Sequence, residues 1–284
     1  MRREAESLAQ VQHPNIVPVY GAGSVGDLHY MALKLVEGGT LADLVRSGAS
    51  RRRVFRVVRD AARGLAALHA RGGVHRDLKP TNVLVEDGAG LLADFGLARL
   101  AEDVTITGTG AMIGTPLYMS PEQWRRERAT PASDVFSLGL VLYESMTGRH
   151  AFLAGGTEAG AAREQLPSLY AAAAAPSPMG VDGVPPAVEE AVRRCLSIDP
   201  AQRYADAGQA ARALDAVDWP EGPEDAEPPA TGPARTVLSV SEGASGSTAP
   251  TLLPAGGQRF GRYDLRGELG SGGMGVVYRA WDPS

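Results

Sequence analysis

Hydrophobic residues recur at a helical period in several segments of the chain. An amphipathic helix is expected over residues 51–73, where a pair of glycines ends it. Its apolar stripe, with spacings of four and three, consists of Val54, Val58, Ala61, Leu65 and Leu68. Residues 133–148 are apolar on nearly every side, which is typical of a buried helix. Three more helices are expected at residues 2–12, 185–200 and 206–217.

Other segments follow the period of two that is typical of strands. Residues 15–23 and 28–39 predict two short strands of a small β-rich lobe, and residues 259–284 predict a β-hairpin around a glycine cluster. A lone hairpin is too small to fold by itself. The pattern predicts an α+β fold, in which a small β-rich lobe is incomplete and a larger lobe is mostly helical.

The composition changes abruptly after residue 218. Residues 219–258 are rich in Pro, Gly, Ala, Ser, Thr and Glu, and they have few large apolar side chains to repay the entropy cost of ordering. We expect this stretch to be a disordered linker. The chain then divides into a main domain at 1–218, the linker at 219–258 and the glycine-rich hairpin at 259–284.

The overall composition narrows the class of protein. With 284 residues, of which 44% are hydrophobic, the chain is long enough to bury a large core. A net charge of −5 argues against a general affinity for nucleic acid, and no apolar run is long enough to span a membrane. The single cysteine, Cys195, excludes an internal disulfide and favours a reducing compartment, so a cytoplasmic location is expected.

Polar residues crowd the loop that follows the helix at 51–73. The stretch "VHRDLKPTNVLV", residues 74–85, places Asp77, Lys79 and Asn82 where they can point together. A carboxylate can orient a hydroxyl group and accept its proton, a cation can hold a phosphoryl group, and an amide oxygen can bind a metal. The alternative is a charged surface loop. The length of the full pattern, His-Arg-Asp-x-Lys-x-x-Asn, favours a phosphoryl-transfer site.

A second acidic motif follows in "LLADFGLARL", twelve residues after the asparagine of the first. Asp94 stands there at the end of an apolar strand, as a candidate ligand for a hard divalent ion such as Mg²⁺. The tripeptide Asp-Phe-Gly is weak evidence by itself. Its order and its distance from the first motif make the pair specific for phosphoryl transfer.

Together the two motifs resemble the protein kinase family, in particular the eukaryotic-like serine/threonine kinases of bacteria. The resemblance extends over most of the chain and implies the two-lobed protein kinase-like fold, with ATP and Mg²⁺ as cofactors. It implies that Asp77 is the catalytic base and that Lys79 contacts the γ-phosphate. The residues implied to hold the metal are Asn82 and Asp94, and those implied to pack are His75 and Phe95.

The stretch "GTPLYMSPE", residues 114–122, resembles the end of the family's activation segment. The likeness implies that Thr115 lies near the catalytic loop and that Glu122 pairs with Arg203. It also implies that Asp134 heads the buried helix that anchors the catalytic loop.

Three threonines, Thr105, Thr107 and Thr109, lie on the polar stretch before that segment end. Phosphate on one of them could dock on Arg76, beside the catalytic aspartate, and order the segment. The alternative is an unmodified, flexible loop. The hypothesis includes autophosphorylation of the chain and its association with a second copy of itself.

The resemblance also outlines a nucleotide pocket. In "MALKLVEGG" it implies a gatekeeper at Leu33 and a hinge whose backbone faces the adenine at Lys34, Leu35 and Val36. Leu84 would form the floor under the base. The stretch "GSGGMGVV" fits the pattern Gly-x-Gly-x-x-Gly-x-Val, in which backbone approaches the phosphates and a valine covers the base. Its residues are Gly270, Gly272, Gly275 and Val277.

One part of the nucleotide site has no match. The helix at 2–12 resembles the mobile helix of the small lobe, with Glu4 as the partner of a phosphate-binding lysine. The strand that carries this lysine precedes that helix in the family, whereas the chain begins at Met1. The only lysines are Lys34 and Lys79, and both are already assigned. No lysine remains for the α- and β-phosphates.

Two arrangements account for a glycine loop at the end of the chain. In the first, the chain is circularly permuted and the hairpin folds back on its own small lobe. The linker is long enough to let the hairpin fold back. However, the strands that would flank the absent lysine strand would face a gap of unpaired N–H and C=O groups. In the second, which explains both ends, the chain is a piece of tandem kinase domains and the hairpin begins the next domain.

The sequence predicts a serine/threonine kinase that transfers the γ-phosphoryl group of Mg-ATP to protein substrates. The alternative is a pseudokinase, a nucleotide-binding or scaffolding module that signals by contact. The intact catalytic and metal-binding residues argue for chemistry, and the absent lysine argues for the alternative.

Overall fold

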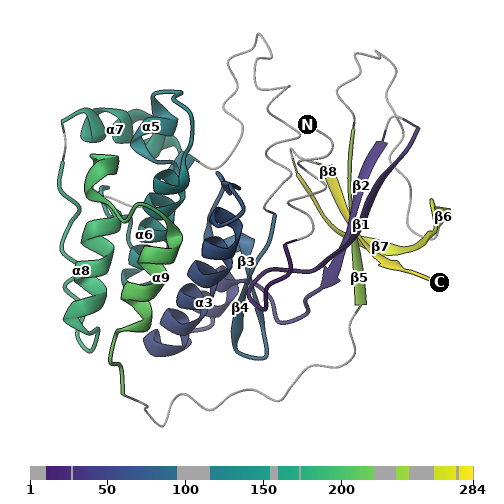
Figure 1. Cartoon of the computed structure of the whole chain (residues 1–284), viewed down its shortest axis with the longest axis horizontal. Coiled ribbons are helices and arrows are strands. Elements are labelled where there is room, and N and C mark those ends of the chain that lie inside the picture. Colours follow the sequence, from purple (N-terminus) through teal and green to yellow (C-terminus); the bar gives the residue numbers. More distant parts are fainter. Residues whose placement is uncertain are drawn as a thin grey trace.

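The computed structural model describes residues 11–26, 28–94, 116–153, 159–172, 174–220, 235–242, 259–272 and 275–283 of the chain. A helical lobe and a β-sheet lobe lie side by side (Figure 1). This arrangement confirms the two-lobed α+β fold. None of the described helices has the length and apolar character needed to cross a bilayer.

Two long helices form the centre of the large lobe. Helix α3 spans Arg51–His69, and its whole predicted stripe is buried. Its N-cap is Ser50, whose hydroxyl accepts a hydrogen bond from the backbone N–H of Arg53. Helix α6 spans Pro131–Thr147, is buried on nearly every side, and ends at Gly148 with the left-handed φ of 68° that favours glycine.

Shorter elements surround this pair. Of the other predicted helices, α8 at Pro186–Cys195 and α9 at Ala207–Asp215 are confirmed, whereas residues 1–10 lie outside the described residues. The remaining helices are α2 (Leu41–Arg46), α5 (Pro121–Trp124), α7 (Ala159–Ala171) and the 3-10 turns η1 (Pro80–Asn82), η2 (Pro116–Tyr118) and η3 (Pro200–Gln202). A small ladder pairs β3 (Val83–Glu86) with β4 (Ala89–Leu92).

The small lobe is one antiparallel sheet. Its strands lie in the order β1-β2-β5-β8-β7-β6, so segments from both ends of the chain meet in it (Figure 1). Their bounds are β1 Val19–Val25, β2 Leu28–Leu35, β5 Arg235–Glu242, β6 Arg259–Phe260, β7 Tyr263–Gly272 and β8 Gly275–Trp281. One apolar cluster joins β2 to the hairpin, where Tyr30 meets the rings of Phe260 and Tyr263 edge to face.

Strand β5 corrects the expectation that residues 219–258 have no regular structure. Residues 235–242 form eight residue pairs with β2 and five with β8. Their sequence, "RTVLSVSE", contains β-branched residues suited to a strand, and two open edges supply hydrogen-bond partners that a linker considered alone does not have. The first linker residue, Trp219, packs its ring on Phe55 of α3 and so belongs to the large lobe.

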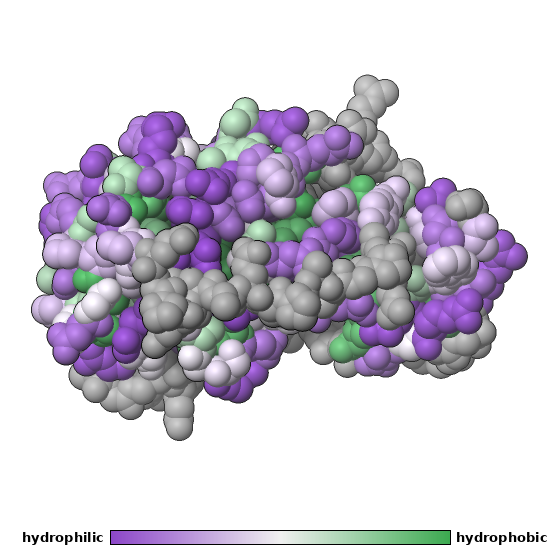
Figure 2. Space-filling view, turned by 90° about the horizontal axis from the view of Figure 1, so that it is seen from below, coloured by the Kyte–Doolittle hydropathy of each residue, from purple (hydrophilic) through white to green (hydrophobic). Residues whose placement is uncertain are grey.

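The predicted gap in the small lobe is therefore closed. Strand β5 lies between β2 and β8, where the missing strand left unpaired backbone groups in the sequence-based picture. The backbone groups that were expected to stay unpaired are paired in this sheet, because pairing with neighbours decided the strand and local composition did not. Figure 2 shows the molecule from below the view of Figure 1. The described part of this face is largely hydrophilic, with hydrophobic patches near the middle of the molecule.

Candidate active site

The loop at residues 74–79 is held by one buried carboxylate. Asp134, in the first turn of α6, accepts hydrogen bonds from the backbone N–H groups of His75 at 2.6 Å and Arg76 at 2.8 Å. The ring Nε2 of His69 lies 2.8 Å from the same carboxylate. Because Arg76 has a φ of 72°, a left-handed bend, the two amides can point at one side chain. This geometry matches the anchoring implied for Asp134.

Three of the predicted catalytic residues meet directly. Lys79 Nζ donates to Asp77 Oδ2 at 2.7 Å. The Nδ2 group of Asn82 donates to the backbone oxygen of Asp77 at 2.8 Å and reaches its Oδ2 at 3.3 Å. Asn82 itself is buried in the short turn η1. The loop therefore gathers a carboxylate, a cation and an amide within hydrogen-bond range.

The second motif lies next to this loop. The backbone of Ala93 ties the two together, since its N–H donates to Asn82 O and its carbonyl oxygen lies 2.9 Å from His75 Nε2. Because a carbonyl can only accept, Nε2 carries the proton, and Nδ1 accepts from the N–H of Asp77. His75 is fully buried, as a packing residue should be.

Asp94 follows with a left-handed φ of 60°. Its side chain keeps contact with solvent, but the protein around it withdraws enough water to raise the pKa of the carboxyl. The charge of Lys79 acts in the opposite direction, and that of Asp77 adds to the rise. A carboxylate that is costly to ionise gains from a nearby cation.

An apolar pocket of about 210 Å³ adjoins Asp94. Its walls contain the predicted gatekeeper Leu33 and the predicted hinge residues Lys34, Leu35 and Val36. They also contain Leu84, predicted to lie under the base, and Val277, predicted to cover it. Sequence reasoning missed four other lining residues, Val17, Thr81, Ala93 and Leu269. Leu269 directly precedes the first glycine of the loop, so its position next to that motif could have revealed it.

The glycine loop joins β7 to β8. Gly270 pairs with Val277 and Gly272 pairs with Gly275 across the hairpin, so all three predicted glycines lie at its tip end. A register shift between Glu268 and Gly270 bends the strand just before the loop. The hairpin thus contributes Leu269 and Val277 to the lining of the pocket.

A buried ion pair joins α5 to Arg203, the residue that follows η3. Arg203 donates to both carboxylate oxygens of Glu122, at 2.8 and 3.0 Å, and Ser133 donates to one of them at 2.7 Å. Burial alone would raise the pKa of Glu122, but these hydrogen bonds and the guanidinium charge outweigh it and hold the pKa below its ordinary value. The implied pairing of these two residues is present.

Some predicted residues lie outside the described residues. They are Glu4, Phe95, Thr105, Thr107, Thr109 and Thr115. Both lysines are described and both are ion-paired, Lys34 with Glu86 and Lys79 with Asp77. Strand β5, which lies beside the glycine hairpin, contains no lysine.

Comparisons with known proteins agree with this geometry. The model of the protein kinase domain matches residues 1–216. The chain belongs to the protein kinase family. Serine/threonine-protein kinase PknL of Mycobacterium tuberculosis (strain ATCC 25618 / H37Rv) is 40% identical over 219 residues, which are 76% of this chain and 54% of that protein. Serine/threonine-protein kinase PknB of Mycolicibacterium smegmatis is 35% identical over 269 residues, or 90% of this chain and 42% of that protein.

The kinase domain spans about half the length of the curated relatives it matches. Its relatives place it in the bacterial, eukaryotic-like serine/threonine branch of the family. Among the described residues, no group of three His, Cys, Asp or Glu side chains forms a metal site.

Proposed function

We propose that the chain is a serine/threonine protein kinase that transfers the γ-phosphoryl group of Mg-ATP to protein hydroxyl groups. The observation that carries the proposal is the cluster of Asp77, Lys79 and Asn82 beside Asp94 and an apolar pocket. An apolar pocket suits a nucleotide base, and the oxygens next to it suit a hard cation. These residues therefore fit both implied cofactors.

Each residue has a defined task in that reaction. Asp77 orients the substrate hydroxyl and takes its proton, while Lys79 steadies the phosphoryl group. Bound Mg-ATP would supply the phosphoryl group and the positive charge that its transfer requires. Asn82 and Asp94 are the proposed metal ligands, and the glycine hairpin would hold the phosphates through its backbone. Since little covalent chemistry falls to the protein, positioning supplies most of the rate.

The test is incorporation of labelled phosphate into the chain and into a general Ser/Thr protein substrate. Asp77→Asn should lower the rate by about 10²- to 10⁴-fold, because it removes the proton acceptor and keeps the shape. The control is Asp87→Asn, at an exposed turn between β3 and β4 whose φ of 49° asparagine accepts. Equal rates for the two variants would refute the proposal.

A second candidate is a nucleotide-binding module without phosphotransfer. The observation that favours it is that both lysines are already ion-paired and that β5 offers none to the phosphates. If nucleotide binds at the pocket while the wild-type rate equals that of Asp77→Asn, this candidate replaces the kinase.

Further features of the proposal concern the whole chain. We infer that the glycine hairpin serves the same kinase domain as residues 11–220, and the shared six-stranded sheet supports this over the start of another domain. Phosphorylation of Thr105, Thr107 or Thr109, docking on Arg76, remains a proposal, as do protein substrates, self-association and a cytoplasmic setting. Phosphopeptide mapping of the active chain tests the threonines, and the absence of phosphate there would refute that part.

A further inference from the structure

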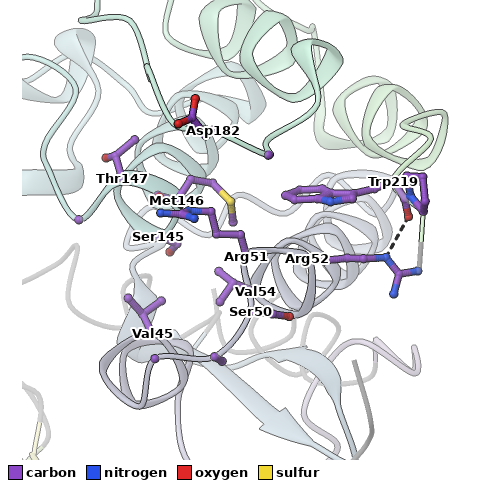
Figure 3. Close-up of a pocket in the computed structure, with 15 residues that line it drawn as sticks. Val45, Ser50, Arg51, Arg52, Val54, Ser145, Met146, Thr147, Asp182 and Trp219 are labelled. Carbon is purple, nitrogen blue, oxygen red and sulfur yellow. Dashed lines mark hydrogen bonds between the residues drawn. The ribbon is translucent and has the colours of Figure 1, made fainter. Parts of the chain in front are cut away.

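A second cavity lies in the large lobe, on elements that the proposed active site does not use. It has a volume of about 640 Å³ and lies where five segments converge (Figure 3). They are the end of α2, the start of α3, the end of α6, the chain just before α8 and the chain after α9. Cavities of a few hundred Å³ are the size that proteins use for small organic ligands.

One wall holds a buried polar group that has no partner. Ser145 of α6 is 8% exposed, and its hydroxyl makes no hydrogen bond to any described residue. A buried hydroxyl without a partner carries a desolvation cost that a ligand could relieve. This is the observation that separates the cavity from a plain surface recess.

Positive charge faces that hydroxyl. Arg51 reaches from the first turn of α3 to α6, where its Nε donates to the backbone oxygen of Met146 at 3.3 Å. Figure 3 shows its guanidinium next to Met146 and Ser145. Arg52 lines the cavity from the same turn, and its Nε donates to the backbone oxygen of Trp219. The positive end of the α3 dipole adds to these charges, and Asp182 is the acidic residue of the lining.

Apolar side chains form part of the remaining lining. Val45 and Val54 line the cavity together with Met146 and Trp219. The indole of Trp219 rests on Phe55 with its ring centroid 5.2 Å away, so it is fixed in place as a flat surface. Figure 3 shows the Trp219 ring and Met146 on one side of Arg51 and Val45 on the other. A flat apolar body could therefore lie beside the charged and hydroxylic end.

We propose that this cavity binds an organic carboxylate with an aromatic body. The carboxylate accepts hydrogen bonds from the Arg51 guanidinium and from Ser145 Oγ, and the aromatic body packs on Trp219 and Met146. A guanidinium fork matches the two oxygens of a carboxylate, which selects the acid over an uncharged analogue of the same shape. The site is independent of nucleotide binding.

The probe is 2-naphthoate, titrated calorimetrically into the full chain, and 2-naphthamide is its uncharged analogue. We expect saturable binding of the acid at millimolar concentration or below, and at least about tenfold weaker binding of the amide. A non-hydrolysable ATP analogue should leave the binding unchanged. Absence of binding, equal affinity for acid and amide, or displacement by the nucleotide would each overturn the proposal.

Variants locate the binding. Arg51→Gln and Ser145→Ala should each weaken 2-naphthoate, Arg51→Gln by about tenfold or more. Ser145→Ala also serves if the arginine variant fails to fold, because alanine is tolerated within a helix. The control is Arg56→Gln, on the same helix but not in the lining, and it should bind as the wild type does. If Ser145→Ala and Arg56→Gln bind with the wild-type affinity, the carboxylate does not lie in this cavity and the proposal fails.

Discussion

Glu122 links the stability of the large lobe to pH. Its pKa in the folded chain lies below the ordinary 4.5, because the hydrogen bonds and charge of Arg203 outweigh the effect of burial. A depressed pKa adds stability that is fully present above pH 4.5 and is lost as the pH falls toward the folded value. We therefore expect the free energy of unfolding to fall on acidification below about pH 5, as urea titrations at successive pH values would record.

The variant that isolates this effect is Glu122→Gln. It keeps the shape but leaves Arg203 buried without a counter-charge, so we expect a loss of about 3 to 5 kcal/mol at neutral pH. Below pH 4.5 the difference in unfolding free energy between variant and wild type should shrink. The wild-type carboxyl then takes up a proton in the unfolded chain before it does so in the folded chain, which removes the stabilisation. Glu190→Gln, in an exposed pair with Arg193, serves as the control and should change little. A difference that stays constant with pH would contradict the linkage.

Asp134 anchors the loop at residues 74–79 to helix α6. It accepts from two loop amides and lies in hydrogen-bond range of His69, and an asparagine would turn an NH₂ group toward one of these donors. Asp134→Asn should destabilise the chain by about 2 to 4 kcal/mol and should also lower phosphotransfer in the fraction that remains folded. Thermal unfolding and labelled-phosphate incorporation on the same sample measure the two effects. An unchanged specific activity would show that the loop holds its shape without this anchor.

Helix α3 approaches two other segments so closely that each contact requires a glycine. In one contact the glycine belongs to α3, and in the other it belongs to the neighbouring strand. A Cβ on Gly64 would come within 2.2 Å of the Asn15 backbone oxygen, and a Cβ on Gly90 of β4 would come within 2.2 Å of the Val57 oxygen. Gly64→Ala should therefore destabilise the chain by about 1 to 3 kcal/mol despite the helix propensity of alanine. Gly208→Ala in α9, where the nearest atom is Oδ1 of the N-cap Asp206 at 3.1 Å and no backbone atom is close, should cost less than Gly64→Ala. Urea midpoints of the two variants, compared where the slope of free energy against urea is unchanged, measure both effects. Equal midpoints for Gly64→Ala and the wild type would disprove the close approach.

The elements differ in how far the sequence alone predicts them. The period of the apolar stripe in α3 and the all-round apolar character of α6 predicted both helices, because burial of one face or of all faces decides them locally. Strand β5 was not predicted, since its partners are separated from it by long stretches of chain and sheet pairing is a tertiary effect. Motif spacing predicted the cluster around Asp77 and could also have revealed Thr81, which directly precedes Asn82. Val17 joined the pocket only by packing against Leu91 and Ala93.

At the scale of the whole molecule, the small lobe depends on the place of β5 in the sheet. Ser239 is paired with Met31 on one side and with Val277 on the other. Residues directly opposite each other on neighbouring strands share a face of the sheet, so position 239 lies on the face that Val277 presents to the pocket. A charge introduced at this register position would therefore lie on the face of the sheet that borders the pocket.

Ser239→Lys tests that register and the completeness of the site together. If β5 pairs in this register, the lysine adds a positive charge above the phosphates and should raise phosphotransfer by about tenfold or more. Ser239→Met, which has similar length and no charge, should leave the rate unchanged, and the combination with Asp77→Asn should abolish the gain. Because β5 and the glycine hairpin pair within one chain, the gain per molecule should also persist on dilution. A gain that disappears on dilution would mean that a second copy supplies the strand, and equal rates for the lysine and methionine variants would rule out the register.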